Sequence, residues 1–493
     1  MAIRRNGHDQ IGHWRGAARN AVMVFLLSAC AACTQGPDYV RPSVEVPVDY
    51  RFDEGLTTTP DTATWWNAFD DEVLNGLIRE AIASNRDLRV ATARVDEFAA
   101  VLRGTQSQGR PQVGYGGNVS RERTIVEGTD IQSTASNFGA ILTASWEIDL
   151  WGRIRRETEA ARANLLATQE ARRGVILTLV ASVINSYVTL LDLDSRLRIA
   201  ETTLAARAQS VSLYRARREG GTISDFEMAQ ILAEYESAVA AIPDLQQAIA
   251  QQENALSILL GRNPGPIPRG RNLDTIHSPT VPASLPAELL TRRPDILQAE
   301  QQLIASNALI GAARALYFPR ISLTALGGLA SVALGNLFSG TARAWSFVGE
   351  VAGPIYTGGG IAAANQQAEA RREQSLAAYE RTIQNAFREV EDALVAVRTS
   401  REVEESYERR VAQLDRGVTL ARLRYDNGYS DMLDVLDTER GLFSAQLSLA
   451  AAKADRYRAL VSLYRALGGD WIDEAEQLSA SAATPEPALV RRP

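Results

Sequence analysis

A mainly α-helical fold with a β-barrel part is the fold class that the sequence predicts, and three observations predict it. The 493 residues contain one unit in two tandem copies, a long segment of each copy shows a seven-residue apolar period, and two shorter segments of each copy alternate every second residue. A period of seven is typical of coiled-coil helices, and a period of two is typical of β-strands. The chain is therefore expected to combine long helices with a few strands.

Two copies of one unit account for most of the chain. A shift of 207 residues without a gap places Gly152 on Gly359 and Leu260 on Leu467, and upstream the shift becomes 208. Such self-similarity is the mark of a duplicated structural unit. The copies span residues 74–261 and 282–468, and the proline-rich linker 262–281 between them cannot form one continuous helix. Each copy is expected to contain a helix, a β-hairpin (residues 111–150 or 319–356), a long helix and a returning helix.

The long helices follow from the seven-residue period. Apolar residues recur at this spacing from Ile176 to Val211, and the second copy repeats the pattern from Ile383 to Val418. About 60 helical residues at ~1.5 Å each would make a rod of roughly 90 Å. Residues 175–184 form the most apolar stretch, but Arg172, Arg173 and Asn185 bound it too closely for a membrane span, so we interpret it as the buried part of a helical bundle.

The alternating segments predict four strands with one apolar face each. In the first hairpin Val113, Tyr115 and Val119 alternate with polar or small residues, and the second hairpin repeats the alternation around Leu323 and Phe347. Strands of about 9 to 11 residues match the thickness of a membrane. Four strands cannot close a barrel, and open edges in lipid would leave backbone groups unpaired, so several chains would have to complete one barrel. The alternative is a pair of soluble hairpins packed on the helical body.

The first residues are typical of an export signal. Residues 1–29 combine arginines with a short apolar run that is too short to span a bilayer, as in a signal peptide. The sequence from Leu27 to Cys30 resembles a bacterial lipobox, which predicts a lipid on Cys30 and an anchored linker over residues 30–73. Cys33 is the alternative lipidation site, and a plain secretory signal with an unmodified thiol is the third possibility.

Composition excludes several classes of function. A net charge of −7 removes the electrostatic basis for nucleic-acid binding. The three histidines and two cysteines leave no ligand set for zinc or an iron-sulfur cluster, and no catalytic or nucleotide-binding motif is found. We therefore expect no enzyme, no metal and no cofactor apart from the covalent lipid. The tail, residues 469–493, has no assignable role, and its part from residue 476 is expected to be flexible.

Several motifs in a fixed order resemble the TolC-type outer-membrane efflux proteins, in particular their NodT or OprM-like lipoprotein branch. The motifs are Gly36-Pro37-Asp38-Tyr39, Trp65-Trp66, Glu147-Ile148-Asp149-Leu150-Trp151-Gly152-Arg153, Arg292-Arg293-Pro294-Asp295 and Phe318-Pro319-Arg320-Ile321-Ser322-Leu323. The resemblance implies a homotrimer in which three chains give four strands each to a twelve-stranded outer-membrane barrel, above a periplasmic tunnel of long helices. The family cysteine usually lies a few residues before the Gly-Pro-Asp-Tyr motif, which favours Cys33.

The resemblance also implies the biological setting. The chain would be the outer-membrane channel of a tripartite efflux pump of the resistance-nodulation-division type, exporting small toxic compounds or antibiotics. Its partners would be a periplasmic adaptor (membrane fusion protein), an inner-membrane pump and outer-membrane lipid. The alternatives are a type I protein-secretion duct and a non-conducting coiled-coil lipoprotein scaffold in the periplasm.

Two carboxylates are the candidate gate. Asp434 and Asp437 lie three residues apart, hence on one helix face, and in a trimer each would give three converging charges. The resemblance places them at the periplasmic entrance, with Tyr425 in the same closing network. The alternative for both residues is a solvated carboxylate on a helix face. A further alternative for Asp434 is helix capping, because it is the counterpart of Glu227, which forms a predicted capping box with Ser224.

The turns between long and returning helices are the candidate docking tips for an adaptor. Arg217 with Gly221 and Arg424 with Gly428 share an Arg-x-x-x-Gly spacing. The glycines are needed for the reversal of the chain on any interpretation. The arginines either dock the adaptor or bridge neighbouring helices.

Overall fold

A computed structural model describes residues 34–52, 65–125, 132–279, 286–469 and 471–483. Residues 1–33, with Cys30 and Cys33, lie outside the described residues. The chain forms two compact units: unit 1 from residues 1–43, 95–168 and 299–379, and unit 2 from residues 44–94, 169–298 and 380–493. Each unit draws on both sequence copies, because the long helices belong to one unit at one end and to the other unit at the other end.

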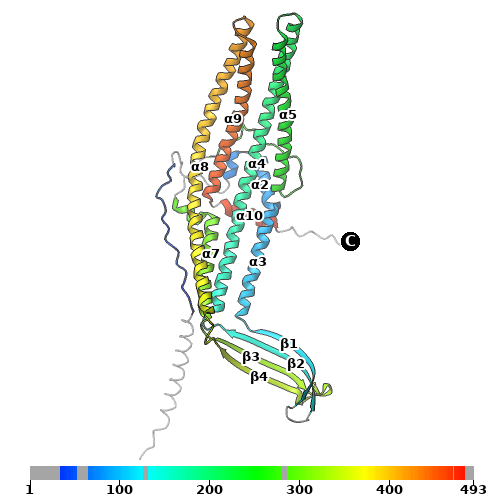
Figure 1. The fold of residues 1–493 in the computed structure, drawn as a ribbon, viewed down its shortest axis with the longest axis vertical. Coiled ribbons are helices and arrows are strands. Elements are labelled where there is room, and N and C mark those ends of the chain that lie inside the picture. Colours follow the sequence, from blue (N-terminus) through cyan, green and yellow to red (C-terminus); the bar gives the residue numbers. More distant parts are fainter. Residues whose placement is uncertain (1–33, 53–64, 126–131, 280–285, 470, 484–493) are drawn as a thin grey trace, which may run out of the picture. The chain divides into compact units, whose positions relative to one another are not determined.

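The helices of the first half begin with the short 3-10 helix η1 (Trp65–Phe69) and continue with α2 (Glu72–Ser84), α3 (Arg86–Gln108), α4 (Arg153–Glu219) and α5 (Asp225–Leu259). The second half contains α6 (Leu289–Arg292), α7 (Pro294–Ala315), α8 (Gly360–Asp426), α9 (Met432–Leu467) and α10 (Trp471–Ala483). The two long helices that the seven-residue period predicts are α4 and α8, of 67 residues each. Figure 1 shows α4 turning back into α5 and α8 turning back into α9.

Unit 1 contains one antiparallel sheet with the strand order β1-β2-β3-β4 (Figure 1). Its strands are β1 (Gln112–Ile125), β2 (Gln132–Ile148), β3 (Arg320–Ser331) and β4 (Arg343–Ala352). The register pairs Tyr115 with Leu142, Leu142 with Gly327, and Gly327 with Trp345. Most of the large apolar residues of the four strands therefore share one face, as the two-residue alternation predicts, whereas Ile141, Leu326 and Val348 lie on the other face.

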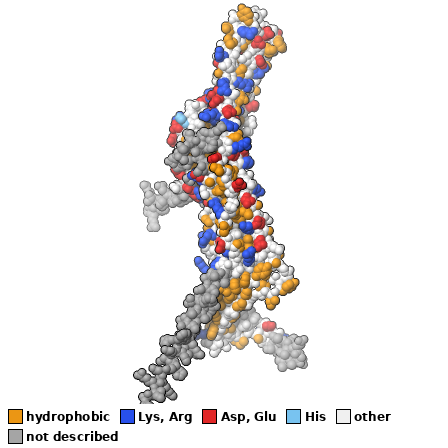
Figure 2. Space-filling view, turned by 90° about the vertical axis from the view of Figure 1, so that its left-hand side faces the viewer, with side chains coloured by type: hydrophobic (Ala, Val, Ile, Leu, Met, Phe, Trp, Pro, Cys, Tyr) orange, Lys and Arg blue, Asp and Glu red, His pale blue; other side chains and the backbone are white. Residues whose placement is uncertain are grey.

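The apolar face of the sheet is exposed. Tyr115 is 92% exposed and Trp345 is 82% exposed, and Val113 and Phe347 are similarly uncovered. Figure 2 shows hydrophobic side chains gathered on part of the surface of unit 1. Hence the described part of unit 1 has no helix that covers this face, which argues against the alternative of soluble hairpins packed on a helical body.

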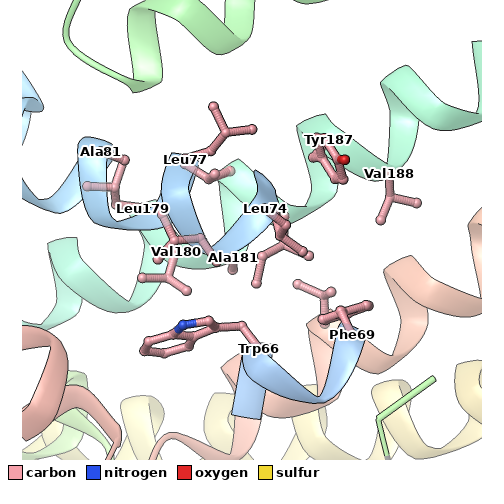
Figure 3. Close-up of a cluster of buried hydrophobic side chains, with 14 of the residues drawn as sticks. Trp66, Phe69, Leu74, Leu77, Ala81, Leu179, Val180, Ala181, Tyr187 and Val188 are labelled. Carbon is pink, nitrogen blue, oxygen red and sulfur yellow. The ribbon is translucent and has the colours of Figure 1, made fainter. Parts of the chain in front are cut away.

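The core of unit 2 lies where η1 and α2 pack against the middle of α4. Figure 3 shows side chains that meet there, namely Trp66, Phe69, Leu74, Leu77 and Ala81 on one side and Leu179, Val180, Ala181, Tyr187 and Val188 on the other. By length and composition alone α4 could span a membrane, but 56% of its apolar window is buried in the protein. This burial confirms that residues 175–184 belong to a packed bundle.

The C-terminal segment differs from the prediction. The sequence predicts a flexible tail from residue 476, but residues 476–483 continue helix α10, which starts at Trp471. Trp471, Ile472 and Ala475 are almost fully buried, and the Trp471 ring meets the rings of Trp65 and Trp66 edge-on. The tail prediction is wrong for this part because three buried apolar residues at helical spacing anchor an otherwise polar helix.

Candidate gate and docking tips

Both reversals between long and returning helices use the same backbone motif. Gly221 and Gly428 have φ values of +74° and +75°, a region that glycine adopts without strain. The carbonyl of Arg217 accepts from the N–H of Thr222, and the carbonyl of Arg424 accepts from the N–H of Tyr429. These are the long hydrogen bonds of a Schellman motif. The shared Arg-x-x-x-Gly spacing therefore has a backbone role, whatever the arginine side chains bind.

The two returning helices begin differently. Ser224 and Glu227 form the predicted capping box at the start of α5. Asp431 stands at the same place before α9, but its side chain accepts no capping hydrogen bond. The capping alternative for Asp434 is thereby weakened, because its side chain is exposed and no reciprocal box forms around it.

Arg217 joins the first helical hairpin, α4–α5, to the second, α8–α9. Its guanidinium donates to Asp426 at 3.1 Å and lies 5.2 Å from the centre of the Tyr214 ring. The rings of Tyr214 and Tyr425 meet edge-on at 6.1 Å. Burial and the nearby charge of Glu227 raise the pKa of Tyr425, so its hydroxyl stays protonated at neutral pH. Among the predicted residues, Arg217 and Tyr425 thus meet in one inter-hairpin contact.

A second contact between the hairpins lies further from the tips, and sequence reasoning missed it. Arg440 of α9 donates to Glu234 of α5 at 2.7 Å, and Glu234 also pairs with Arg207 of α4 at 3.1 Å. Burial lowers the pKa of Arg207, although the charge of Glu234 opposes this effect. Arg440 also lies 3.5 Å from Asp437. The only sequence signal is the three-residue spacing of Asp437 and Arg440, because Glu234 is 206 residues away from Arg440.

The structure places the remaining predicted residues on the surface of unit 2. The Asp437 side chain is 77% exposed, and Asp434 is also exposed, one helical turn away on α9. Arg424 is exposed and donates to the carbonyl of Tyr429 at 3.3 Å. Apolar residues behind them hold the hairpins together, since Val211 and Ile231 of the first hairpin cluster with Val435 of the second. Exposed carboxylates on a firmly packed hairpin can present charge to a solvent-filled space.

The Gly-Pro-Asp-Tyr motif forms a strap, residues 34–43, that is docked on the helices of unit 1. Arg156 of α4 donates to the carbonyls of Gln35 and Gly36 and pairs with Asp38 at 2.8 Å. Tyr39 donates to Glu300 of α7 at 3.1 Å, and burial together with this carboxylate raises the pKa of Tyr39. The strap therefore ties the segment that follows the cysteines to two helices of unit 1.

A glycine in α7 makes this docking possible. A Cβ at Gly311 would lie 2.4 Å from the carbonyl oxygen of Gln35, and a Cβ at Gly36 would lie 2.4 Å from the Gly311 Cα. Gly311→Ala is expected to displace the strap and to lower thermal stability, although alanine alone favours a helix over glycine by about 1 kcal/mol. Thermal unfolding and limited proteolysis of residues 34–43 would measure the change.

Gly104→Ala is the matched control, since Gly104 lies inside helix α3 of the same unit and a Cβ added there would meet no atom within 4 Å. That variant should be neutral or slightly stabilising, with an intact strap. Equal stabilisation by both alanines would show that the strap does not depend on the close approach at Gly311.

Comparison with known proteins identifies the family. The family model described as outer membrane efflux protein matches residues 77–262 and 285–469. The probable efflux pump outer membrane protein TtgC of Pseudomonas putida is 36% identical over 479 residues, covering 95% of this chain and 98% of TtgC. The cation efflux system protein CusC of Escherichia coli is 37% identical over 449 residues, covering 90% and 97%. The solved outer-membrane channel OprN has a TM-score of 0.84 at 29% identity, covering 89% of this chain and 100% of that one.

These matches confirm three predictions. The fold class is confirmed, because the chain shares its long helices and four antiparallel strands with solved outer-membrane channels. The predicted function in efflux through an outer-membrane channel and the predicted location in the outer membrane are also confirmed. The relatives that confirm them align with this chain over nearly the full length of both proteins. With both sequence copies matched, the chain belongs to the outer membrane efflux protein family.

Proposed function

We propose that the channel is a homotrimer in which each chain contributes four strands to one twelve-stranded barrel. The support is the sheet itself: β1 and β4 are its two edges, and its apolar face is continuous and exposed. In lipid an open edge would leave backbone N–H and C=O groups unpaired at several kcal/mol each, so edges must pair between copies. The long helices of three duplicated chains would then enclose a periplasmic tunnel.

The partners and cargo are part of the same proposal. The channel would receive substrates from an inner-membrane pump of the resistance-nodulation-division type through a periplasmic adaptor that contacts the tips around Gly221 and Gly428. The names of relatives include an efflux pump and a cation efflux system, and small toxic compounds or antibiotics are the proposed cargo here. The chain itself would be a conduit without enzymatic activity or cofactor.

A lipid on Cys30, or on Cys33, would anchor the chain after removal of the signal peptide. The docked strap supports this proposal, because its first described residue, Thr34, directly follows Cys33 in sequence and belongs to unit 1, which also contains the sheet. At ~3.5 Å per residue, a lipidated Cys30 would lie within about 14 Å of the strap and Cys33 within about 4 Å. Either cysteine would thus keep the acyl chains near the proposed barrel.

The entrance would be closed where the second hairpins of three chains converge. Asp434 and Asp437 are exposed on α9, and convergence of three copies would form rings of negative charge that favour cations. Opening would require the α8–α9 hairpin to move relative to α4–α5, and adaptor binding would bias this two-state element.

Removing both carboxylates tests the entrance. At a closed entrance the carboxylates would accept hydrogen bonds from a neighbouring chain. In a strain that lacks the gene and is complemented with Asp434→Ala/Asp437→Ala, uptake of large antibiotics should therefore rise several-fold, because the loss of roughly 1 kcal/mol of such closing contacts in total shifts the open population about fivefold. In planar bilayers the cation preference of the channel should fall as well.

The control is Glu236→Ala/Asp244→Ala, which removes two exposed carboxylates from α5 away from the turn. It should leave uptake and ion preference unchanged. Unchanged permeability of the Asp434/Asp437 variant, at normal expression, would remove these residues from the gate.

A further inference from the structure

The exposed apolar face of the sheet ends at arginines on both edge strands. On β1 the apolar positions up to Val119 are followed on the same face by Arg121 and Arg123. On β4 the first residue, Arg343, shares its face with Trp345. The three arginines are exposed, and together they are named the arginine rim. The inner strands also turn polar at this end of the face, with Ser136 on β2 and Ser331 on β3.

The position of the rim matches the edge of a membrane. An apolar band ~25 Å tall, crossed by strands tilted by about 40° at ~3.3 Å per residue, takes about 10 residues of each strand. Strand β4 has 10 residues, and Arg343 is the first of them. Counted from the start of β1 at Gln112, the tenth residue is Arg121. The rim therefore stands at the depth where acyl chains give way to headgroups.

The rim is not neutralised on its own face. Glu122 lies between Arg121 and Arg123 in sequence, but the alternation of side chains along a strand places it on the opposite face of the sheet. The described neighbours of the rim on its own face are serine, threonine or apolar residues. Because β1 and β4 are the two edges, closure of a barrel would bring Arg343 of one copy to the strand that carries Arg121 and Arg123 of the next copy.

We propose that the arginine rim binds the phosphate groups of an anionic lipid headgroup in the outer leaflet, at each boundary between subunits. The proposal rests on the trimeric barrel proposed above and deepens it by naming a lipid partner. Guanidinium groups bind phosphate oxygens in pairs of parallel hydrogen bonds, and next to a low-dielectric band such contacts are less screened than in bulk water. An exposed rim with no described carboxylate on its face is complementary to such a headgroup.

Lipid binding by the purified full-length channel tests the rim. Native mass spectrometry in detergent would follow retention of three probes: bis-phosphorylated lipid A, the same glycolipid without phosphates, and inorganic phosphate. The wild type should retain the phosphorylated lipid, and Arg121→Gln/Arg123→Gln/Arg343→Gln should bind it at least about tenfold more weakly, with binding by the wild type falling as salt rises. The control is Arg94→Gln/Arg103→Gln/Arg401→Gln, which removes three exposed helical arginines.

The outcomes separate the lipid site from the barrel. Equal binding by the rim variant and the wild type, equal loss in the control, or equal retention of the phosphate-free glycolipid would overturn the proposal. Displacement of the lipid by inorganic phosphate would assign the rim to a free anion and overturn it too. Trimer mobility on gels and conductance of the same preparations would test the barrel separately. If the rim variant is a conducting trimer with unchanged lipid binding, only the lipid site is contradicted. If the wild type is a monomer, the trimeric barrel is contradicted.

Discussion

Replacing Arg217 and Arg440 together by alanine is expected to shift the channel toward its open state. Both arginines connect the α4–α5 hairpin with the α8–α9 hairpin, Arg217 through Asp426 and Arg440 through Glu234. The double variant removes both ties but leaves Glu234 paired with Arg207, so no buried carboxylate loses its last partner. The hairpins should therefore stay folded while their attachment weakens.

The expected size of the effect follows from the solvent exposure of the two ion pairs. Partly exposed ion pairs contribute about 0.2–1 kcal/mol each, so the two ties amount to roughly 1 kcal/mol per chain. If three chains open together, roughly 3 kcal/mol is lost, which raises the open population about a hundredfold. Single-channel recording in planar bilayers would measure this as longer and more frequent open intervals.

Two other arginines offer a matched control. Arg218 pairs with Asp225 and Arg422 pairs with Glu439, and each of these bridges lies within one hairpin. Arg218→Ala/Arg422→Ala removes the same charge and two similar bridges, yet it should leave the open population near that of the wild type. If both double variants raised conductance equally, loss of positive charge and not separation of the hairpins would explain the effect.

The periodic parts of the fold could be predicted from the sequence because periodicity reports burial directly. A seven-residue period needs one buried stripe on a helix, and α4 buries Ile176, Val183 and Leu190 completely. A two-residue period needs one distinct face on a strand, and the observed register puts Tyr115 and Leu142 opposite each other on that face. The positions of the turns could be predicted from Gly221 and Gly428, because a tight reversal of the chain needs a residue with positive φ, which glycine adopts without strain.

Contacts between distant residues could not be predicted in this way. Glu234 looks like any surface carboxylate of a helix until the fold brings Arg440 and Arg207 to it. Helix α10 was not predicted, because most of its residues are polar or small. Its anchoring by Trp471 depends on aromatic rings near the other end of the chain, such as that of Trp66. Gly311 carried a weak signal, since glycine inside a helix usually has a packing reason, but its partner in the strap was not deducible.

Placing an arginine at Leu142 is expected to prevent assembly of the channel in a membrane. Leu142 lies in the middle of the apolar face, between Tyr115 and Gly327 on the neighbouring strands, and it is 61% exposed in the single chain. An arginine on the lipid-facing side near the midplane costs about 2–4 kcal/mol per chain, hence roughly 6–12 kcal/mol for three chains. This cost equals or exceeds the free energy of unfolding of many folded domains, so insertion into the membrane should fail. Refolding into liposomes, followed by the yield of heat-resistant trimer on gels, would measure it.

An arginine at the neighbouring residue, Thr143, tests whether contact with lipid is the reason for the failed assembly. Thr143 follows Leu142 directly, so its side chain lies on the opposite face, which would line the water-filled interior of the barrel. Thr143→Arg adds the same side chain to the same strand at the same depth, and it should give trimers in nearly normal yield with a lower preference for cations. Equal failure of both variants would mean that the strand tolerates no bulk at this position, and normal assembly of Leu142→Arg would show that the apolar face does not contact lipid. If the yield of trimer falls for Leu142→Arg alone, the exposed apolar face of the sheet is the face that lipid covers.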